Sequence, residues 1–424
     1  MRWWNSFARR TVERRSEQTV KLLFLTSRLP YPPFRGDKLH LLNILKPMSR
    51  RHEIVLVSFI QNDEERQWFE ELRPFCKRIE VVHLPTWRSL LSCMGAVLSN
   101  TPFQVAYFRS RQMQDLVRRV AGEERPDAIH IHLIRMAQHA EKLRDIPRVV
   151  DLTDATSLYL SRFRMASRNP LKKLLLAEEL RRILLYESLL TTFDRSLVCS
   201  PLDLSVMIRH VPGAKVEIAR NAVDMGRFPQ LDGTVKTDAN RLIFTGNMTY
   251  FPNADAAQFL VRDILPLVRR EIPGVRVFLV GQNPPLSVRA LAGDGVVVTG
   301  FVEDISAEYA RSAVAVAPVR FGAGTLYKLL EPLALGVPVV TTTTGIGGLD
   351  LTPGIDVLVA DSAAALADHI VCLLRDPDLR HALSQRAALK VRALHDWDAV
   401  AGDLERVYAA ILAEHRDVEK AGAQ

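Results

Sequence analysis

Short apolar runs alternate with longer helical patterns through the first half of the chain. The runs VKLLFLTS, EIVLVSF, RIEVVHL, DAIHIHL, RVVDLTDA and RSLVCS each have the length and composition of a buried strand. A loop with proline and glycine, RLPYPPFRGDK, and the helical pattern LHLLNILKPMSRRH lie between the first two runs. Apolar strands that alternate with helices indicate a parallel sheet covered on both faces.

The same alternation starts again near residue 241. Strands are predicted at RLIFTGN, VRVFLVG, GVVVTGF, AVAVAPV and VPVVTTT, and helices at ADAAQFLVRDILPLVRREIP and ISAEYARS. The fold class predicted is therefore α/β, with two Rossmann-like domains facing each other. The predicted divisions are a basic leader (1–20), a first domain (21–222), a linker (223–240), a second domain (241–395) and a C-terminal helix and tail (396–424). Ligands of open parallel sheets bind beyond the carboxyl ends of the strands, so a cleft between the domains is expected.

Composition agrees with a globular chain of two or three domains. The 424 residues are 48% hydrophobic and 25% charged. The four cysteines are far apart and form no C-x-x-C pair, so we expect neither a disulfide framework nor a thiolate zinc site. Reduced thiols and a cytoplasmic protein are the expectation.

The net charge of +8 is concentrated in two places. The first 21 residues hold six basic and two acidic residues around Trp3, Trp4 and Phe7, and residues 161–182 hold seven basic and two acidic residues. No apolar core follows the first cluster, so it is not a signal peptide. No nucleic-acid-binding signature is present, and nucleic acid is not an expected partner. An anionic membrane surface is the predicted partner of these clusters, with a solvated terminus as the alternative for the leader.

Twenty uncharged residues lie between Arg88 and Arg109, a length that can span a bilayer. Asn100, Pro102 and Gln104 dilute this run, and Pro102 would interrupt a helix. We therefore predict a helix, a turn and an extended piece. An ordinary core helix is expected here, with a surface that dips into lipid as the alternative.

The glycine-containing loops after strands predict an anion site. Neither G-x-G-x-x-G nor G-x-x-x-x-G-K-[ST] occurs after a first strand, so we expect no nicotinamide cofactor and no P-loop. The loops TGN (245–247), TGF (299–301) and FGAGT (321–325) allow close backbone approach, and the N–H groups of a following helix favour an anion such as a diphosphate.

Lys328 and Glu331 follow the third loop and share one helix face. A surface ion pair is the alternative to a binding role. Because the rest of this segment is apolar and the pair lies beside a glycine-rich loop, we predict that Lys328 meets phosphate oxygens. Glu331 is predicted to accept hydrogen bonds from ribose hydroxyls.

Several motifs resemble those of family 4 glycosyltransferases, which have the GT-B fold. The motifs are GTLYKLLEPLALGVPVVTT, FTGNMTYFPNADA, VTGFVEDI and IARNAVD. SRLPYPPFRGDK and VVDLTDATSLYLSRF most resemble the sugar transferases of exosortase/PEP-CTERM systems. The resemblance covers roughly residues 21–344 and implies that 21–222 is the acceptor side and 241–395 the donor side.

The resemblance also implies roles for individual residues. Glu331 matches the second glutamate of an E-x7-E motif, whereas Ala323 stands at the position of the first. The donor-side residues that it implies are Gly246, Asn247, Phe301, Val302, Arg320, Gly324, Thr325, Lys328 and Glu331. Lys328 would neutralise the diphosphate with help from Arg320, and Phe301 and Val302 would contact the nucleobase.

On the acceptor side the resemblance points to Gly36 and Asp37, in a mobile loop over the cleft. His132 is a candidate contact to the donor sugar or the acceptor, with a structural histidine as the alternative. Asp154 is expected either to hydrogen-bond a sugar hydroxyl or to cap the following helix.

The activity implied is a retaining transfer from a nucleotide sugar to a glycan or lipid-linked acceptor in exopolysaccharide biosynthesis, with no cofactor. No D-x-D motif is placed to hold a metal, and the leaving phosphate can take the acceptor's proton. Lys328, Glu331 and His132 are the candidate catalytic residues. The alternatives are a nucleotide-sugar epimerase or hydrolase on the same fold, and a non-catalytic scaffold that binds a sugar nucleotide, which Ala323 suggests.

Overall fold

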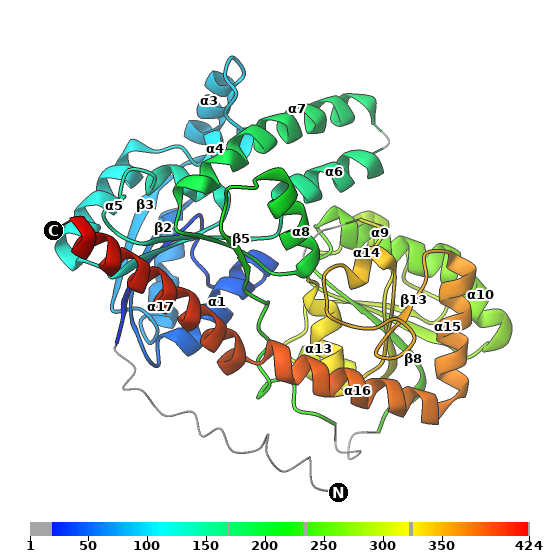
Figure 1. Cartoon of the computed structure of the whole chain (residues 1–424). Coiled ribbons are helices and arrows are strands. Elements are labelled where there is room, and N and C mark those ends of the chain that lie inside the picture. Colours follow the sequence, from blue (N-terminus) through cyan, green and yellow to red (C-terminus); the bar gives the residue numbers. More distant parts are fainter. Residues whose placement is uncertain (1–18, 168, 232–235, 322–324, 423–424) are drawn as a thin grey trace, which may run out of the picture.

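A computed structural model describes residues 19–167, 169–231, 236–321 and 325–422. Two α/β domains lie side by side, and the chain crosses between them twice (Figure 1). The leader predicted at 1–20 lies almost wholly outside the described residues.

The first domain is built on a seven-stranded parallel sheet with the order β3-β2-β1-β4-β5-β6-β7. Its strands are β1 (Lys21–Thr26), β2 (Glu53–Ile60), β3 (Arg78–His83), β4 (Ala128–His132), β5 (Arg148–Thr153), β6 (Arg195–Val198) and β7 (Val216–Ile218). Six of them were predicted. The seventh has only three residues, with a glutamate at its centre, and gives no apolar run that could predict it.

Helices cover both faces of this sheet. They are α1 (Gly36–Met48), α2 (Phe69–Leu72), α3 (Thr86–Ala96), α4 (Phe103–Tyr107), α5 (Arg111–Glu124), α6 (Thr156–Ala166), α7 (Pro170–Tyr186) and α8 (Pro201–His210), with 3-10 turns at η1 (Asp63–Trp68), η2 (Ile134–His139) and η3 (Glu187–Thr192). One apolar core contains residues of α1, and the other contains residues of α5 and α8.

The uncharged run between Arg88 and Arg109 differs from its prediction in two ways. Its second part is the helix α4 rather than an extended piece, because Pro102 lies at the N-cap, where its missing N–H costs no hydrogen bond. Its first part, α3, is not an ordinary core helix, since only Ser89 and Ala96 are buried. Among the described residues, no helix has the length and apolar content needed to cross a membrane.

The second domain has a six-stranded parallel sheet with the order β10-β9-β8-β11-β12-β13. Its strands are β8 (Asp238–Thr245), β9 (Arg276–Val280), β10 (Val296–Gly300), β11 (Ser312–Ala317), β12 (Val339–Thr341) and β13 (Leu358–Val359). Its helices are α9 (Phe251–Phe259), α10 (Leu265–Glu271), α11 (Leu286–Arg289), α12 (Ile305–Ala310), α13 (Tyr327–Leu335), α14 (Thr343–Ile346), α15 (Ala363–Arg375) and α16 (Pro377–His395).

The helix predicted over 254–273 is divided. A π-helical turn, η4 (Leu260–Ile264), separates α9 from α10. Pro266 follows this turn and has no backbone N–H with which to continue α-helical bonding, which accounts for the division.

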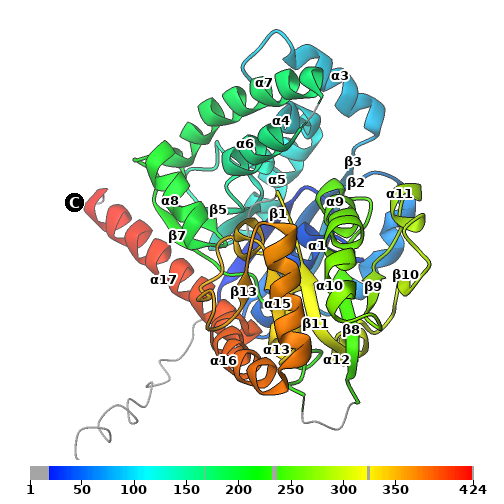
Figure 2. The ribbon, with the colours of Figure 1, turned by 90° about the vertical axis from the view of Figure 1, so that its right-hand side faces the viewer.

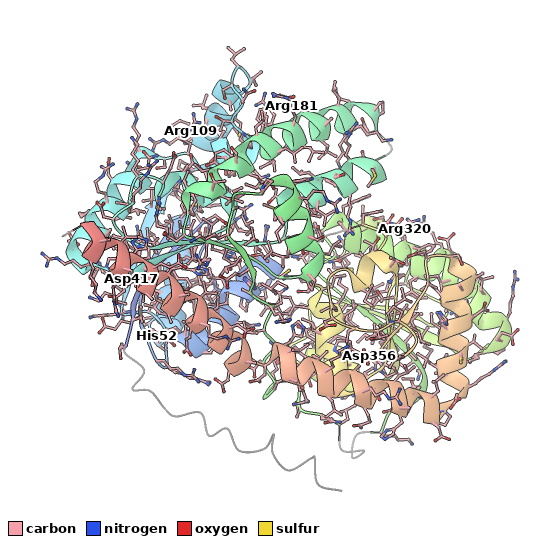
Figure 3. All side chains as sticks on the ribbon, in the orientation of Figure 1. His52, Arg109, Arg181, Arg320, Asp356 and Asp417 are labelled. Carbon is pink, nitrogen blue, oxygen red and sulfur yellow. The ribbon has the colours of Figure 1, made fainter. Side chains whose placement is uncertain are left out.

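The C-terminal helix α17 (Trp397–Gly422) returns from the second domain to the first (Figure 2). Leu404, Tyr408 and Ile411 are buried in the same core as α1. The Tyr408 hydroxyl lies 2.7 Å from His130 Nδ1, and Glu405 Oε1 lies 3.2 Å from His52 Nε2, which Figure 3 labels. The last helix of the chain is thus part of the first domain's core.

We expect Ile411→Ala to destabilise the first domain by about 2 to 5 kcal/mol, because a fully buried side chain leaves a cavity. Val418→Ala, on an exposed position of the same helix, should change stability by less than about 0.5 kcal/mol. Calorimetric melting of both variants tests this. Equal melting temperatures for the two would show that α17 does not stabilise the domain.

Candidate active site

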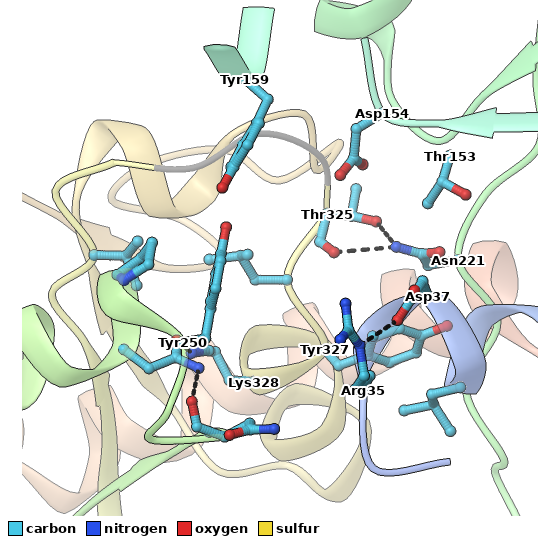
Figure 4. Close-up of a pocket in the computed structure, with 18 of the residues that line it drawn as sticks. Arg35, Asp37, Thr153, Asp154, Tyr159, Asn221, Tyr250, Thr325, Tyr327 and Lys328 are labelled. Carbon is cyan, nitrogen blue, oxygen red and sulfur yellow. Dashed lines mark hydrogen bonds and ion pairs between the residues drawn. The ribbon is translucent and has the colours of Figure 1, made fainter. Parts of the chain in front are cut away.

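A cleft of about 760 Å³ lies between the two domains. Its first wall consists of the loop before α1, the ends of β4 and β5, and α6. Its second wall consists of the loop after β8 and the beginning of α13 (Figure 4). The ends of parallel strands meet at one edge of each sheet, and the cleft lies where these two edges face each other.

The cleft brings together eight of the predicted site residues. These are Gly36, Asp37, Asp154, Gly246, Asn247, Thr325, Lys328 and Glu331. His132, Phe301, Val302 and Arg320 are not among the residues that line it. Gly324, and with it Ala323, lies outside the described residues.

Lys328 is held at the base of the cleft by the loop after β8. Its Nζ donates a hydrogen bond to Asn253 Oδ1 and lies 4.9 Å from the centre of the Phe244 ring. A Cβ on Gly246 would lie 3.0 Å from this Nζ and 2.7 Å from Asn253 Nδ2, so a larger residue would force these two side chains to move. Burial lowers the pKa of Lys328 to about 7, partly opposed by the charge of Glu331.

Glu331 lies one turn further along α13. Its Oε2 accepts a hydrogen bond of 3.3 Å from the Tyr309 hydroxyl, and burial raises the pKa of the carboxyl to about 7. No salt bridge joins Lys328 to Glu331, and both line the cleft. The alternative of a surface ion pair is therefore wrong.

Three of the donor-side residues lie away from the cleft lining. Arg320 forms a bidentate ion pair with Asp255, at 2.6 and 2.9 Å, and its guanidinium stacks 4.6 Å from the Phe259 ring centre. It is not directed at Lys328, contrary to the expectation. Phe301 contacts Phe34 edge to face at 5.7 Å, which joins the two domains, and Val302 packs against the second domain's core.

An excess of arginine surrounds Asp37 on the first wall. The Asp37 carboxylate lies 3.2 Å from Arg35 Nε, 3.6 Å from Arg28 Nη1 and 3.8 Å from Arg135 Nη2. Burial opposes its ionisation, but Arg35 and Arg135 hold the pKa of Asp37 below its usual value. Three guanidinium groups against one carboxylate leave positive charge for an anion.

Sequence reasoning missed Arg35 and Arg135, both of which line the cleft. The only signal in the sequence for these two arginines is their position next to predicted features. Arg35 immediately precedes the predicted Gly36, and Arg135 comes three residues after the strand that ends at His132.

His132 lies behind the first wall in a buried ionic network. Asp151 Oδ2 lies 2.8 Å from His40 Nε2, 3.4 Å from His130 Nε2 and 3.5 Å from His132 Nδ1. Burial opposes the charge of both partners, yet each holds the other ionised: the pKa of His40 is raised and that of Asp151 is well below its usual value. Burial lowers the pKa of His132. This placement favours the structural alternative for His132.

The ends of β4 and β5 turn sharply into the cleft. Leu133 and Thr153 both line it and have positive φ angles of 72° and 61°. Such backbone strain concentrates at functional sites. The Thr153 hydroxyl is buried, and no described group hydrogen-bonds to it.

Asp154 follows Thr153 and faces the cleft. The N-cap of α6 is Ala155, without a side-chain cap, so the capping role proposed for Asp154 is wrong. Its Oδ1 lies 3.2 Å from Cys199 Sγ, and burial together with the charge of Asp203 raises the pKa of Asp154 to about 7. The hydrogen bond to a sugar hydroxyl stays a prediction.

Two groups in the described part of the chain could offer metal ligands. Their members are His40, His132 and Asp151 in one group and Asp154, Cys199 and Asp203 in the other. In the first group the carboxylate already pairs with the histidines. In the second, burial raises the pKa of all three groups.

Comparison with known proteins gives partial matches. Residues 239–376 match the sequence model of the family described as glycosyl transferases group 1. Phosphatidyl-myo-inositol mannosyltransferase of Mycobacterium leprae is 30% identical over 216 residues, which are 49% of this chain and 55% of that protein. The chain spans about half the length of the curated relatives it matches. The match over 239–376 supports a glycosyltransferase family.

Solved structures agree over nearly the whole chain. Sucrose-phosphate synthase of Thermosynechococcus elongatus aligns with a TM-score of 0.67 and 16% identity, over 93% of this chain and 100% of that one. The chain has the GT-B fold. HepE of Anabaena in complex with UDP aligns with a TM-score of 0.63 and 15% identity, over 92% of this chain and 100% of that one. The predicted fold class is thereby confirmed.

We expect the affinity of the unmodified chain for UDP to fall between pH 7.0 and pH 8.5 by about tenfold more than the affinity of a Lys328→Arg variant falls over the same range. Above its pKa of about 7 the lysine is neutral, so binding an anion must first restore its charge. Arginine stays charged throughout, and the diphosphate is ionised at both values. Because Glu331 also titrates near pH 7, the difference between the two proteins, rather than either profile alone, reports on residue 328. Calorimetry measures both affinities, and identical pH profiles for the two proteins would contradict this role of Lys328.

Proposed function

We propose that the chain is a glycosyltransferase that moves a sugar, with retention, from a nucleotide-sugar donor to a glycan or lipid-linked acceptor. The proposal rests mainly on the placement of Lys328 and Glu331 at the base of the cleft between the two domains of a GT-B fold. The segment that matches the group 1 glycosyl transferase model contains both residues.

The second wall would hold the donor. Lys328 would exchange its contact with Asn253 for the diphosphate, which Gly246 allows to approach closely. The first N–H groups of α13 have no side-chain cap and would donate to the same phosphates. Glu331 would accept hydrogen bonds from the ribose. The UDP in the HepE complex is support for a nucleotide donor.

The transfer needs no cofactor in this proposal. The bond between the sugar's anomeric carbon and the phosphate oxygen breaks, and the acceptor oxygen bonds to the same face of that carbon. The leaving phosphate takes the acceptor's proton, while Lys328 stabilises its charge. Asp154 would orient a sugar hydroxyl from the opposite wall.

The first wall would bind the acceptor. Arg35 and Arg135 leave positive charge around Asp37, which fits an acceptor that carries phosphate. A lipid-linked sugar phosphate is such an acceptor, in keeping with exopolysaccharide synthesis by a cytoplasmic enzyme peripheral to the inner face of the membrane. The exosortase/PEP-CTERM setting belongs to this proposal too. A contribution of the leader to membrane binding stays a prediction.

Glu331→Ala should weaken nucleotide binding by about 1 to 3 kcal/mol and remove most transfer, because ribose hydroxyls lose a partly buried acceptor. Lys328→Ala should lower kcat at least as much as Glu331→Ala does, because the departing diphosphate loses a positive charge that would stabilise it. Glu64→Ala, on an exposed turn of the first domain, is the matched control. Calorimetry with nucleoside diphosphates and turnover of nucleotide sugars measure both effects.

The same assays separate the alternatives. Near-normal turnover in a folded Glu331→Ala variant would rule out the donor-site assignment. Release or epimerisation of the donor sugar without an acceptor would indicate a hydrolase or epimerase. Donor binding with no turnover of any donor would indicate a scaffold.

We also expect transfer to continue in EDTA. The charge on the departing diphosphate would be balanced by Lys328 and helix N–H groups, and no D-x-D motif is placed to hold a metal. Turnover before and after chelation tests this. Full loss of activity that magnesium or manganese restores would refute metal independence.

A further inference from the structure

One face of α3 consists of large apolar side chains with little cover. Trp87, Leu90, Leu91 and Met94 follow helical spacing, and Leu98 continues the row beyond the end of the helix. Each is more than half exposed, and Leu98 is 97% exposed. Clustered exposed apolar groups of this kind mark interaction sites rather than ordinary surface.

Helix α7 carries a second group of exposed apolar side chains. Leu171, Leu174 and Leu175 are each more than half exposed and share one face of the helix. Arg182 lies on the same face, three turns along.

Arg182 of α7 forms hydrogen bonds with the end of α3. Its guanidinium donates hydrogen bonds to the Ala96 carbonyl at 2.8 Å and the Val97 carbonyl at 3.1 Å, at the end of α3. Glu179 accepts hydrogen bonds from the backbone of α4, at 2.7 Å from Phe103 N and 3.1 Å from Gln104 N. Figures 1 and 2 show α3 and α7 together at one end of the molecule. We call Trp87, Leu90, Leu91, Met94, Leu98, Leu171, Leu174 and Leu175 the α3–α7 surface.

The charge beside this surface is positive. Arg88 and Arg164 are exposed, and among the described residues no carboxylate forms a salt bridge with either. Lys173 is also exposed but lies on the opposite side of α7 from Leu171 and Leu175. Both acidic residues of α7 already have partners. Glu178 forms ion pairs with Arg181 at 2.8 Å and with Arg182 at 2.7 Å, and Glu179 accepts a hydrogen bond from the Phe103 backbone N–H. Exposed apolar side chains with basic neighbours are the pattern of helices that lie on anionic bilayers.

The helix before α7 leads directly to the cleft. Tyr159 of α6 lines the cleft and stacks on Phe163 at 5.9 Å. Phe163 lies 6.2 Å from Phe251 of the second domain, and Lys172 Nζ lies 4.4 Å from the centre of the Phe163 ring. The cleft is therefore lined by α6, the helix that leads into α7, which carries three of the eight residues of the apolar surface.

We infer that the α3–α7 surface docks on an anionic lipid bilayer, with its apolar side chains at the boundary between headgroups and acyl chains. Arg88 and Arg164 contact the lipid phosphates. Docking through this surface places the mouth of the cleft beside the membrane. The inference concerns binding alone and does not require the proposed transfer reaction to be correct.

Flotation of the full chain with vesicles tests the inference. The protein should bind vesicles of equal parts phosphatidylglycerol and phosphatidylcholine, bind pure phosphatidylcholine at least tenfold more weakly, and lose affinity in high salt. The double variant Leu91→Glu/Leu174→Glu should bind the anionic vesicles at least tenfold more weakly. Leu286→Glu, at a 78% exposed position of the second domain, is the matched control and should bind normally. Unchanged melting temperatures show that the variants fold.

Three outcomes would overturn the inference. The first is no binding of the unmodified chain to anionic vesicles. The second is that the double variant binds the vesicles as well as the unmodified chain does. A chain without residues 1–19 that fails to bind, while the double variant still binds, would belong to this outcome. The third is a dimer, seen by sedimentation, that the double variant converts to a monomer while no form binds vesicles, since a second copy of the chain would then cover the surface.

Discussion

Asn221 joins the two domains, and the geometry of the cleft depends on it. Its side-chain amide donates to the Thr325 carbonyl at 3.0 Å, on the loop that leads into α13. Its backbone carbonyl accepts from His395 Nδ1 at 2.7 Å, where the chain crosses back toward the first domain. The neighbouring Ala222 carbonyl accepts from Asn43 of α1 at 2.7 Å. One short segment thus joins α1, the loop before α13 and the second crossing.

Desolvation sets the chemistry of the cleft that this arrangement encloses. Burial lowers the pKa of Lys328 and raises those of Glu331 and Asp154, and all three come to about 7. Groups with such values change charge readily when a ligand arrives, because a phosphate favours the ammonium and a hydroxyl donor favours the carboxylate. Asp154 belongs to the first wall, where arginines also hold Asp37 ionised and leave a net positive charge. The two walls therefore suit different partners.

Features that depend on periodicity and local spacing could be predicted from the sequence. The long apolar strands gave the two sheets, and the spacing of Lys328 and Glu331 gave their shared face. Short or charged strands such as β7 and β13 have too few apolar residues to predict. The partnership of Arg35 and Arg135 around Asp37 depends on contacts between residues about 100 positions apart, which no local pattern contains. For the same reason the apolar run of α3 did not reveal that its face is uncovered, and the pairing of Arg320 with Asp255 could not be foreseen.

A crystal structure of the chain with UDP tests the central claim most directly. We predict that the diphosphate lies in the cleft within about 3 Å of Lys328 Nζ, and that a ribose hydroxyl donates to the Glu331 carboxylate. UDP bound elsewhere, with Lys328 still hydrogen-bonded to Asn253 and no ribose contact at Glu331, would contradict it.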